Sequence, residues 1–174
     1  MTAPAFVDQL RAILLRDLRA LRREIEAYPD DDSVWTVPAG IANSGGTLVL
    51  HLVGNLRSYV GRVIGDDGYE RDRPREFGAR GVPRAGLLRD IDATISAVDR
   101  AMPMLTAEAL AAKYPVAIGA VTVNTQDFLV HLAVHLGYHL GQVDYHRRIV
   151  TGSSATVATV VPAELCSAKP VPSA

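Results

Sequence analysis

The feature that most constrains how this chain folds is an apolar pattern of helical period that recurs in four long segments. In residues 4–28 the apolar side chains follow one another in steps of three and four, which places them on one stripe of a helix. Most of the charged side chains in that segment fall off the stripe. The pattern stops at Pro29 and the acidic run 30–32, so we expect the first helix to end there.

The remaining segments of this kind are 44–63, 87–102 and 125–150. Asn, Ser or Thr residues precede or open the second and fourth segments and can cap their helices. Between 48 and 53 the second segment is apolar around much of its axis, which predicts the most buried helix of the fold. A shorter helix is predicted at about 106–114, because Pro115 and Gly119 interrupt the pattern that follows.

The connections between these segments are long. Residues 29–43 surround Trp35, and residues 65–83 are dense in Gly, Asp, Arg and Pro, which is typical of an exposed crossover. We therefore predict an all-α four-helix bundle over residues 1–150, in which sites form between facing helices. Residues 151–174 are expected to be an extended or disordered tail, with strand-like composition at 156–161.

Composition narrows the class of protein further. A chain of 174 residues with 48% hydrophobic and 21% charged residues is long enough for one folded domain. Its longest apolar run, 48–53, is interrupted by His51 and is far shorter than the roughly 20 residues that cross a bilayer. The net charge is −1, and no basic cluster alternates with aromatic residues, so we expect neither a membrane nor a nucleic acid as partner.

Cysteine usage indicates the compartment. The single cysteine, Cys166, cannot form an internal disulfide, which fits a reducing environment and excludes a cysteine-based zinc site. The first residues lack the pattern of a secretory signal. We expect a cytoplasmic protein in which histidines do any metal binding.

The histidines are distributed unevenly. His131, His135, His139 and His146 all lie in the last helical segment, and the first three are spaced by four, so they stack on one face about 6 Å apart. Two imidazoles placed in this way can chelate one ion. His51, on the helix that is predicted to be most buried, can supply a third ligand. Spacing alone leaves open whether His131 or His139 is the partner of His135.

Three neutral imidazoles suit a divalent ion such as Zn, Ni or Fe(II). They leave the charge of the ion uncompensated, which favours an anion such as hydroxide or thiolate at an open position. The alternative is that these histidines only form hydrogen bonds in the core or at the surface. A di-iron site is not expected, because no Glu precedes a histidine by three, and a Gly-x-Ser-x-Gly hydrolase motif is absent.

Two short motifs carry a family resemblance. They are His135-Leu-Gly-Tyr-His139-Leu-Gly-Gln142 and Leu48-Val-Leu-His51-Leu-Val-Gly-Asn55. Together they resemble helices four and two of the DinB/YfiT-like superfamily of four-helix metalloproteins, and the order of elements agrees over about residues 5–150. The sequence departs from the superfamily pattern at Leu140, where Arg is frequent.

The resemblance implies a metal triad of His51, His135 and His139, and makes His131 a neighbour that packs or forms hydrogen bonds. By position it also implies that Asn55 and Gln142, together with His131, lie in the second shell or the pocket. Members of the superfamily include transferases that use thiols such as bacillithiol or mycothiol and an isomerase of maleylpyruvate. Many members have no assigned activity.

The leading hypothesis is therefore a metal-dependent transferase that activates a low-molecular-weight thiol on the three-histidine site. The alternatives are a metal-dependent hydrolase and a non-catalytic metal-binding protein that takes part in a stress response or binds a ligand. The expected partner is a small-molecule substrate or thiol. A homodimer is predicted from the resemblance and from the Val- and Ala-rich tail.

Overall fold

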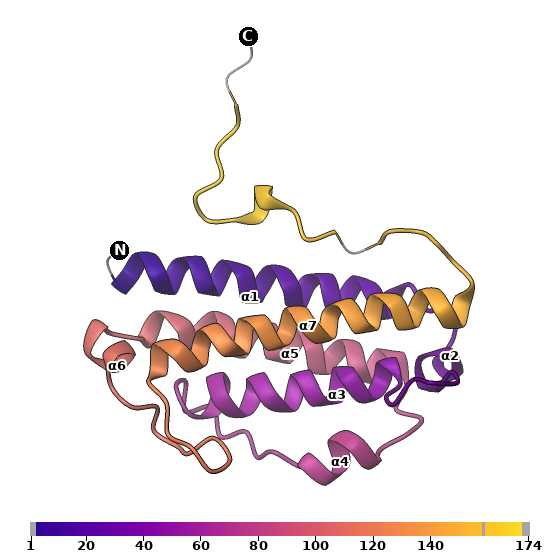
Figure 1. Cartoon of the computed structure of the whole chain (residues 1–174), viewed down its shortest axis with the longest axis horizontal. Coiled ribbons are helices and arrows are strands. Elements are labelled where there is room, and N and C mark those ends of the chain that lie inside the picture. Colours follow the sequence, from indigo (N-terminus) through magenta and orange to yellow (C-terminus); the bar gives the residue numbers. More distant parts are fainter. Residues whose placement is uncertain (1–2, 158, 172–174) are drawn as a thin grey trace.

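Four long helices run side by side and form the body of the molecule (Figure 1). A computed structural model describes residues 3–157 and 159–171. The long helices are α1 (Ala3–Glu26), α3 (Gly45–Leu56), α5 (Arg84–Ala101) and α7 (Thr125–Thr151). Helix α1 packs on α5 and α7, and α3 packs on the same two helices from the other side. The predicted all-α bundle is confirmed.

The core follows from the periodic stripes. Helix α1 contributes a buried row that includes Leu14, Leu18, Leu21 and Ile25. Helix α3 is the most enclosed, as predicted, because every residue from 44 to 54 is buried. The hydroxyl of Ser44 caps this helix by accepting a hydrogen bond from the Thr47 N–H at 3.1 Å. Beyond Leu56 the helix continues as a π-helical segment, η1 (Arg57–Arg62), which positions Tyr59 and its neighbours.

Short helices occupy connections that were predicted to be irregular. Helices α2 (Asp31–Trp35) and α4 (Arg73–Gly78) were both missed, whereas α6 (Ala107–Ala111) lies inside the predicted short helix and is shorter than it. The prediction of an exposed crossover at 65–83 is partly wrong, since α4 lies against α3 (Figure 1) and buries Glu76. Asp72 caps α4 by accepting from the Arg75 N–H at 2.9 Å.

The chain leaves α7 at Gly152, whose φ of +66° is the left-handed conformation that glycine adopts easily. Arg147 Nη2 then donates to the carbonyl of Ala155 at 2.8 Å, and Arg148 Nη1 donates to that of Ser154 at 2.6 Å. The predicted strand at 156–161 is wrong for the residues described there, because this segment pairs with no other strand. Residue 158 lies outside the described residues.

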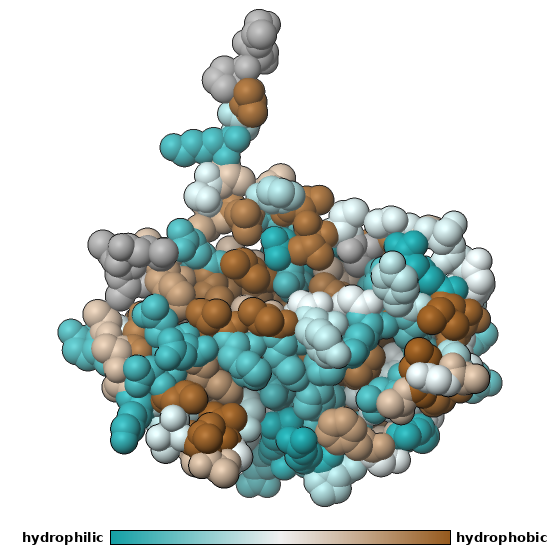
Figure 2. Space-filling model, viewed as in Figure 1, coloured by the Kyte–Doolittle hydropathy of each residue, from teal (hydrophilic) through white to brown (hydrophobic). Residues whose placement is uncertain are grey.

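Farther on, the tail forms one short turn of 3-10 helix, η3 (Pro162–Glu164), near α1 and then projects away from the bundle (Figure 1). Hydrophobic patches on the face shown in Figure 2 are small and separated by hydrophilic residues, and further apolar residues lie along the tail. The homodimer stays a prediction. No helix of the described residues combines the length and apolar character needed to span a membrane.

Candidate metal centre

Three histidines from two facing helices bring their Nε2 atoms together. The Nε2 atom of His135 lies 3.3 Å from that of His51 and 3.1 Å from that of His139. The ligand atoms of all three lie within 4.8 Å of one another. Nitrogen ligands at about 2.0–2.1 Å from a tetrahedral ion are about 3.3 Å apart, so this spacing fits one metal ion. The group could hold a divalent metal ion, and its members are the three histidines of the predicted triad.

The outer nitrogens of two of these rings bind hydrogen-bond acceptors. Nδ1 of His51 lies 3.1 Å from Oε2 of Glu76, and Nδ1 of His139 lies 2.6 Å from Oε1 of Gln142. A carboxylate or amide oxygen can only accept, so both Nδ1 atoms carry the proton and donate. In a neutral imidazole this leaves a lone pair on Nε2, directed at the centre of the triad. Metal-ligating histidines are oriented in this way.

Glu76 is held by more than His51. Nε and Nη2 of Arg71 donate to its two carboxylate oxygens at 2.6 and 2.9 Å. Burial acts to raise the pKa of Glu76, but the hydrogen bonds from Arg71 and His51 outweigh it and hold the pKa below its usual value. The carboxylate is therefore ionised, and the guanidinium of Arg71 balances its charge. The pair that supports the triad therefore carries no net charge.

Gly54 allows the carboxylate of Glu76 to approach the backbone of α3 closely. A Cβ atom at Gly54 would lie 2.1 Å from Oε1 of Glu76, closer than any non-bonded contact permits. The carboxylate thus packs on the bare backbone of α3 one turn after His51. Sequence reasoning missed Glu76. The signals that could have found it are Asp72 followed by Pro74, which mark the start of a helix, and the glycine itself.

The two triad histidines on α7, His135 and His139, are neutral at neutral pH. The pKa of His135 is lowered to about 4, first by burial and then by the neighbouring charges of His139, His51 and His131. Burial also lowers the pKa of His139, against the effect of its hydrogen bond to Gln142. Neutral imidazole is the form that binds a metal.

His131 and Asn55 were predicted to lie in the second shell or the pocket, and neither is a member of the convergent group. His131 is exposed and stacks between Phe128 and His135, with ring centroids 6.0 and 5.9 Å away. Asn55, one turn along α3 from His51, has a buried Oδ1 atom that accepts no hydrogen bond within the described part of the chain. Such a buried acceptor without a partner is unusual.

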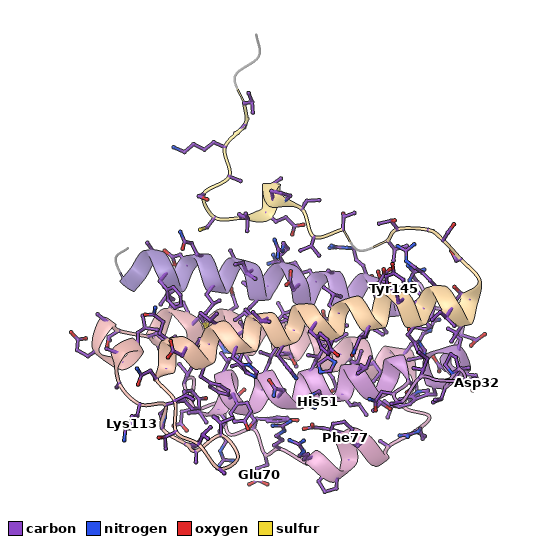
Figure 3. All side chains as sticks on the ribbon, in the orientation of Figure 1. Asp32, His51, Glu70, Phe77, Lys113 and Tyr145 are labelled. Atoms are coloured by element: carbon purple, nitrogen blue, oxygen red, sulfur yellow. The ribbon has the colours of Figure 1, made fainter. Side chains whose placement is uncertain are left out.

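Two aromatic rings flank the centre. The ring of Phe77 on α4 lies 5.1 Å from that of His51, and the ring of Tyr138 lies 5.1 Å from that of His139. Both side chains are exposed, at 39% and 65%. Figure 3 shows Phe77 beside His51 at the edge of the bundle, where α4 faces α3. The centre therefore has apolar sides and is reached from the surface.

The fold and this site define a class of protein, an all-α bundle with a three-histidine centre that could hold a metal ion. Residues 2–164 match a family described as "Protein of unknown function (DUF1572)", and the chain belongs to that family. The match extends past α7 into the tail, which the resemblance to DinB-like proteins did not cover. No protein of curated function matches the chain.

Proposed function

We propose that this chain is a DinB-like metalloprotein that binds one divalent ion through His51, His135 and His139. The observation that carries the proposal is the convergence of three Nε2 atoms, two of them with the opposite nitrogen held by an acceptor. Gln142 and Glu76 orient the ligands. Asn55 and His131 line the approach to the centre, where the buried Oδ1 of Asn55 can accept a hydrogen bond from a bound molecule.

We further propose that the protein is a transferase that uses a low-molecular-weight thiol. Imidazole ligands carry no negative charge and Arg71 balances Glu76, so the protein offers no net negative charge to a divalent ion. A divalent ion in such a neutral site attracts an anion and lowers the pKa of a thiol that binds there. The sulfur would then form a bond to an electrophilic carbon of the substrate, whose leaving group departs with its electron pair while the thiol proton goes to solvent.

The residues around the centre would prepare that transfer. Phe77 and Tyr138 cover the rings of His51 and His139 and limit the access of water to the reacting group. The hydrogen bonds to Glu76 and Gln142 keep two imidazoles from rotating. A cytoplasmic location and a homodimer remain predictions that accompany this proposal.

Turnover tests the proposal. Protein loaded in turn with Zn, Ni or Fe(II) is mixed with a thiol and an electrophile, and loss of free thiol is followed. We expect turnover that His135→Ala abolishes and that His131→Ala, the matched control one turn away, retains in large part. Turnover without thiol would indicate the hydrolase instead. Metal that stabilises the protein without turnover across several thiols would indicate the non-catalytic alternative.

A further inference from the structure

A cavity of about 290 Å³ adjoins the metal centre. It lies between the loop that precedes α3 and the last third of α7. Its lining includes Ile41, Ala42, Leu48, Gln142, Tyr145 and Ile149. This volume is close to the lower end of the range for small-molecule sites, about 300 Å³, so the cavity fits one chemical group rather than a large ligand.

The lining is mostly apolar and carries no formal charge among the residues described, and Asn43 and Gln142 contribute its amide groups. The only titratable groups in it are the phenol of Tyr145 and the imidazole of His146, whose two nitrogens are engaged by Tyr28 and the Thr36 carbonyl. Ile41, Tyr145 and Ile149 are nevertheless exposed, at 37%, 69% and 53%. Large apolar side chains that gather around a hollow at the surface indicate a ligand that covers them.

The cavity is connected to the triad through both helices. Leu48 lies one turn before His51 on α3, and Gln142 follows His139 on α7 and contacts its Nδ1 atom at 2.6 Å. Leu48 and Gln142 each lie three residues from a triad histidine, so this part of the lining is about one helical turn along each helix from the metal ligands. In Figure 3, Tyr145 lies on the side of His51 that faces the end of the bundle where α2 and Asp32 are found.

We propose that the molecule which reacts at the metal centre carries an uncharged apolar group that binds in this cavity. The group has the size of a short alkyl chain or a single ring, and its polar head reaches the triad past Gln142. The inference rests on the proposed metal site, but it concerns different residues. A charged or strongly polar group would lose its hydration there without gaining an ionic partner, so the cavity selects against it.

The first experiment needs no metal. Metal-free protein is titrated with 1-hexanol while the methyl resonances of Ile41, Ala42 and Ile149 are followed by NMR. We expect saturable shifts at these methyl groups and much smaller shifts at Val121, an exposed valine that does not line this cavity. Shifts that are absent, or equal at Val121, would overturn the inference whether or not the protein binds a metal.

The second experiment uses metal-loaded protein and two hydroxamic acids that chelate in the same way. Hexanohydroxamic acid has four more methylenes than acetohydroxamic acid, and their burial is expected to tighten binding at least about tenfold by calorimetry. Ala42→Trp, on an exposed loop, fills the cavity and should reduce this ratio to about two or less. Val134→Trp on the exposed face of α7 is the matched control and should keep the ratio.

Together the two experiments distinguish a failure of the apolar cavity from a failure of the metal site. A ratio that is equal in wild-type protein and Ala42→Trp overturns the apolar cavity while leaving the metal site intact. If acetohydroxamic acid does not bind, the metal site fails, and the 1-hexanol titration alone then decides whether the cavity takes an apolar group.

Discussion

Helix α7 contributes histidines to two polar clusters. One is the triad, and the other is formed by His146 with Tyr28 and Thr36; the two differ in what the histidine nitrogens bind. Toward the end of the helix, His146 is buried, with Nδ1 at 2.7 Å from the hydroxyl of Tyr28 and Nε2 at 2.8 Å from the carbonyl of Thr36. The carbonyl can only accept, so Nε2 donates to it at the shorter distance in preference to accepting from the Gly45 N–H at 3.3 Å, and Nδ1 accepts from Tyr28. Both nitrogens are satisfied by the protein.

In the triad the hydrogen bonds to acceptors are made by the outer nitrogens of His51 and His139. Hydrogen bonds to Glu76 and Gln142 leave lone pairs on Nε2 of His51 and His139, and both face Nε2 of His135. One proton on His135 can serve only one of them well, and lone pairs about 3 Å apart repel. A cation at the centre removes the conflict. Both clusters thus combine burial with histidines at helical spacing. They differ in their lone pairs: those on Nε2 of the triad point at a common centre, which indicates a metal site, whereas the nitrogens of His146 form structural hydrogen bonds.

The largest expected difference between the clusters is in metal affinity. Removing a residue that only supports a ligand costs about 10–100-fold, so removing the ligand itself in His135→Ala should cost more than about 100-fold. His146→Ala should change metal affinity by less than about twofold. Competition against a chromogenic chelator measures both. Equal affinity in wild-type protein and His135→Ala would contradict the assignment of the triad.

Gly54→Ala tests the support of the triad without changing a ligand. The new methyl group would collide with Oε1 of Glu76 and displace the carboxylate that orients His51. We expect metal affinity to fall about 10–100-fold, as for the loss of other outer-shell partners. Gly141→Ala is the control, because a Cβ atom there meets nothing within 4 Å. If both variants retain full affinity, Glu76 does not support the site.

In contrast to Gly54→Ala, Tyr28→Phe should lower the stability of the protein and leave its metal affinity unchanged. It leaves Nδ1 of His146 buried without its donor, and an unsatisfied buried group costs about 1–3 kcal/mol in the free energy of unfolding. Metal affinity should stay unchanged, because the hydroxyl lies in the other cluster. Urea unfolding of metal-free protein gives the first quantity and chelator competition the second. A loss of metal affinity with little loss of stability would show that the clusters are coupled.

Much of the fold and of the triad could be predicted from the sequence. The period of the apolar residues predicted the four long helices, and the resemblance predicted which histidines meet, which spacing alone left open. Glu76 and the role of His146 were missed, because both depend on contacts between segments that are separate in the chain. The helix that carries Glu76 has six residues, too few for periodicity to reveal. Tyr28 and Thr36 lie more than 100 positions from His146.

The pH dependence of stability should also distinguish the clusters. Burial lowers the pKa of His146 from its ordinary 6.5, against the effect of its hydrogen bond to Thr36. Below about pH 6.5 the unfolded chain therefore binds the proton more readily, so His146 lowers stability as the pH falls through that value. Tyr28, whose pKa is raised by burial, does not titrate in this range. Metal-free His146→Gln should lose less stability than wild-type protein between pH 7.5 and 5.5, and an equal loss would contradict this assignment.

The smallest expected effect concerns the helix between the clusters. Gly141 lies between His139 and His146 and is exposed, and glycine within a helix costs about 0.5–1 kcal/mol relative to alanine. Gly141→Ala should raise the free energy of unfolding by about that amount and leave metal affinity and the hydrogen bond of His146 unchanged. If the added rigidity changes metal affinity, the triad relies on bending of α7 at this point. If only stability rises, each cluster is held by its own contacts with α1, α3 and α4.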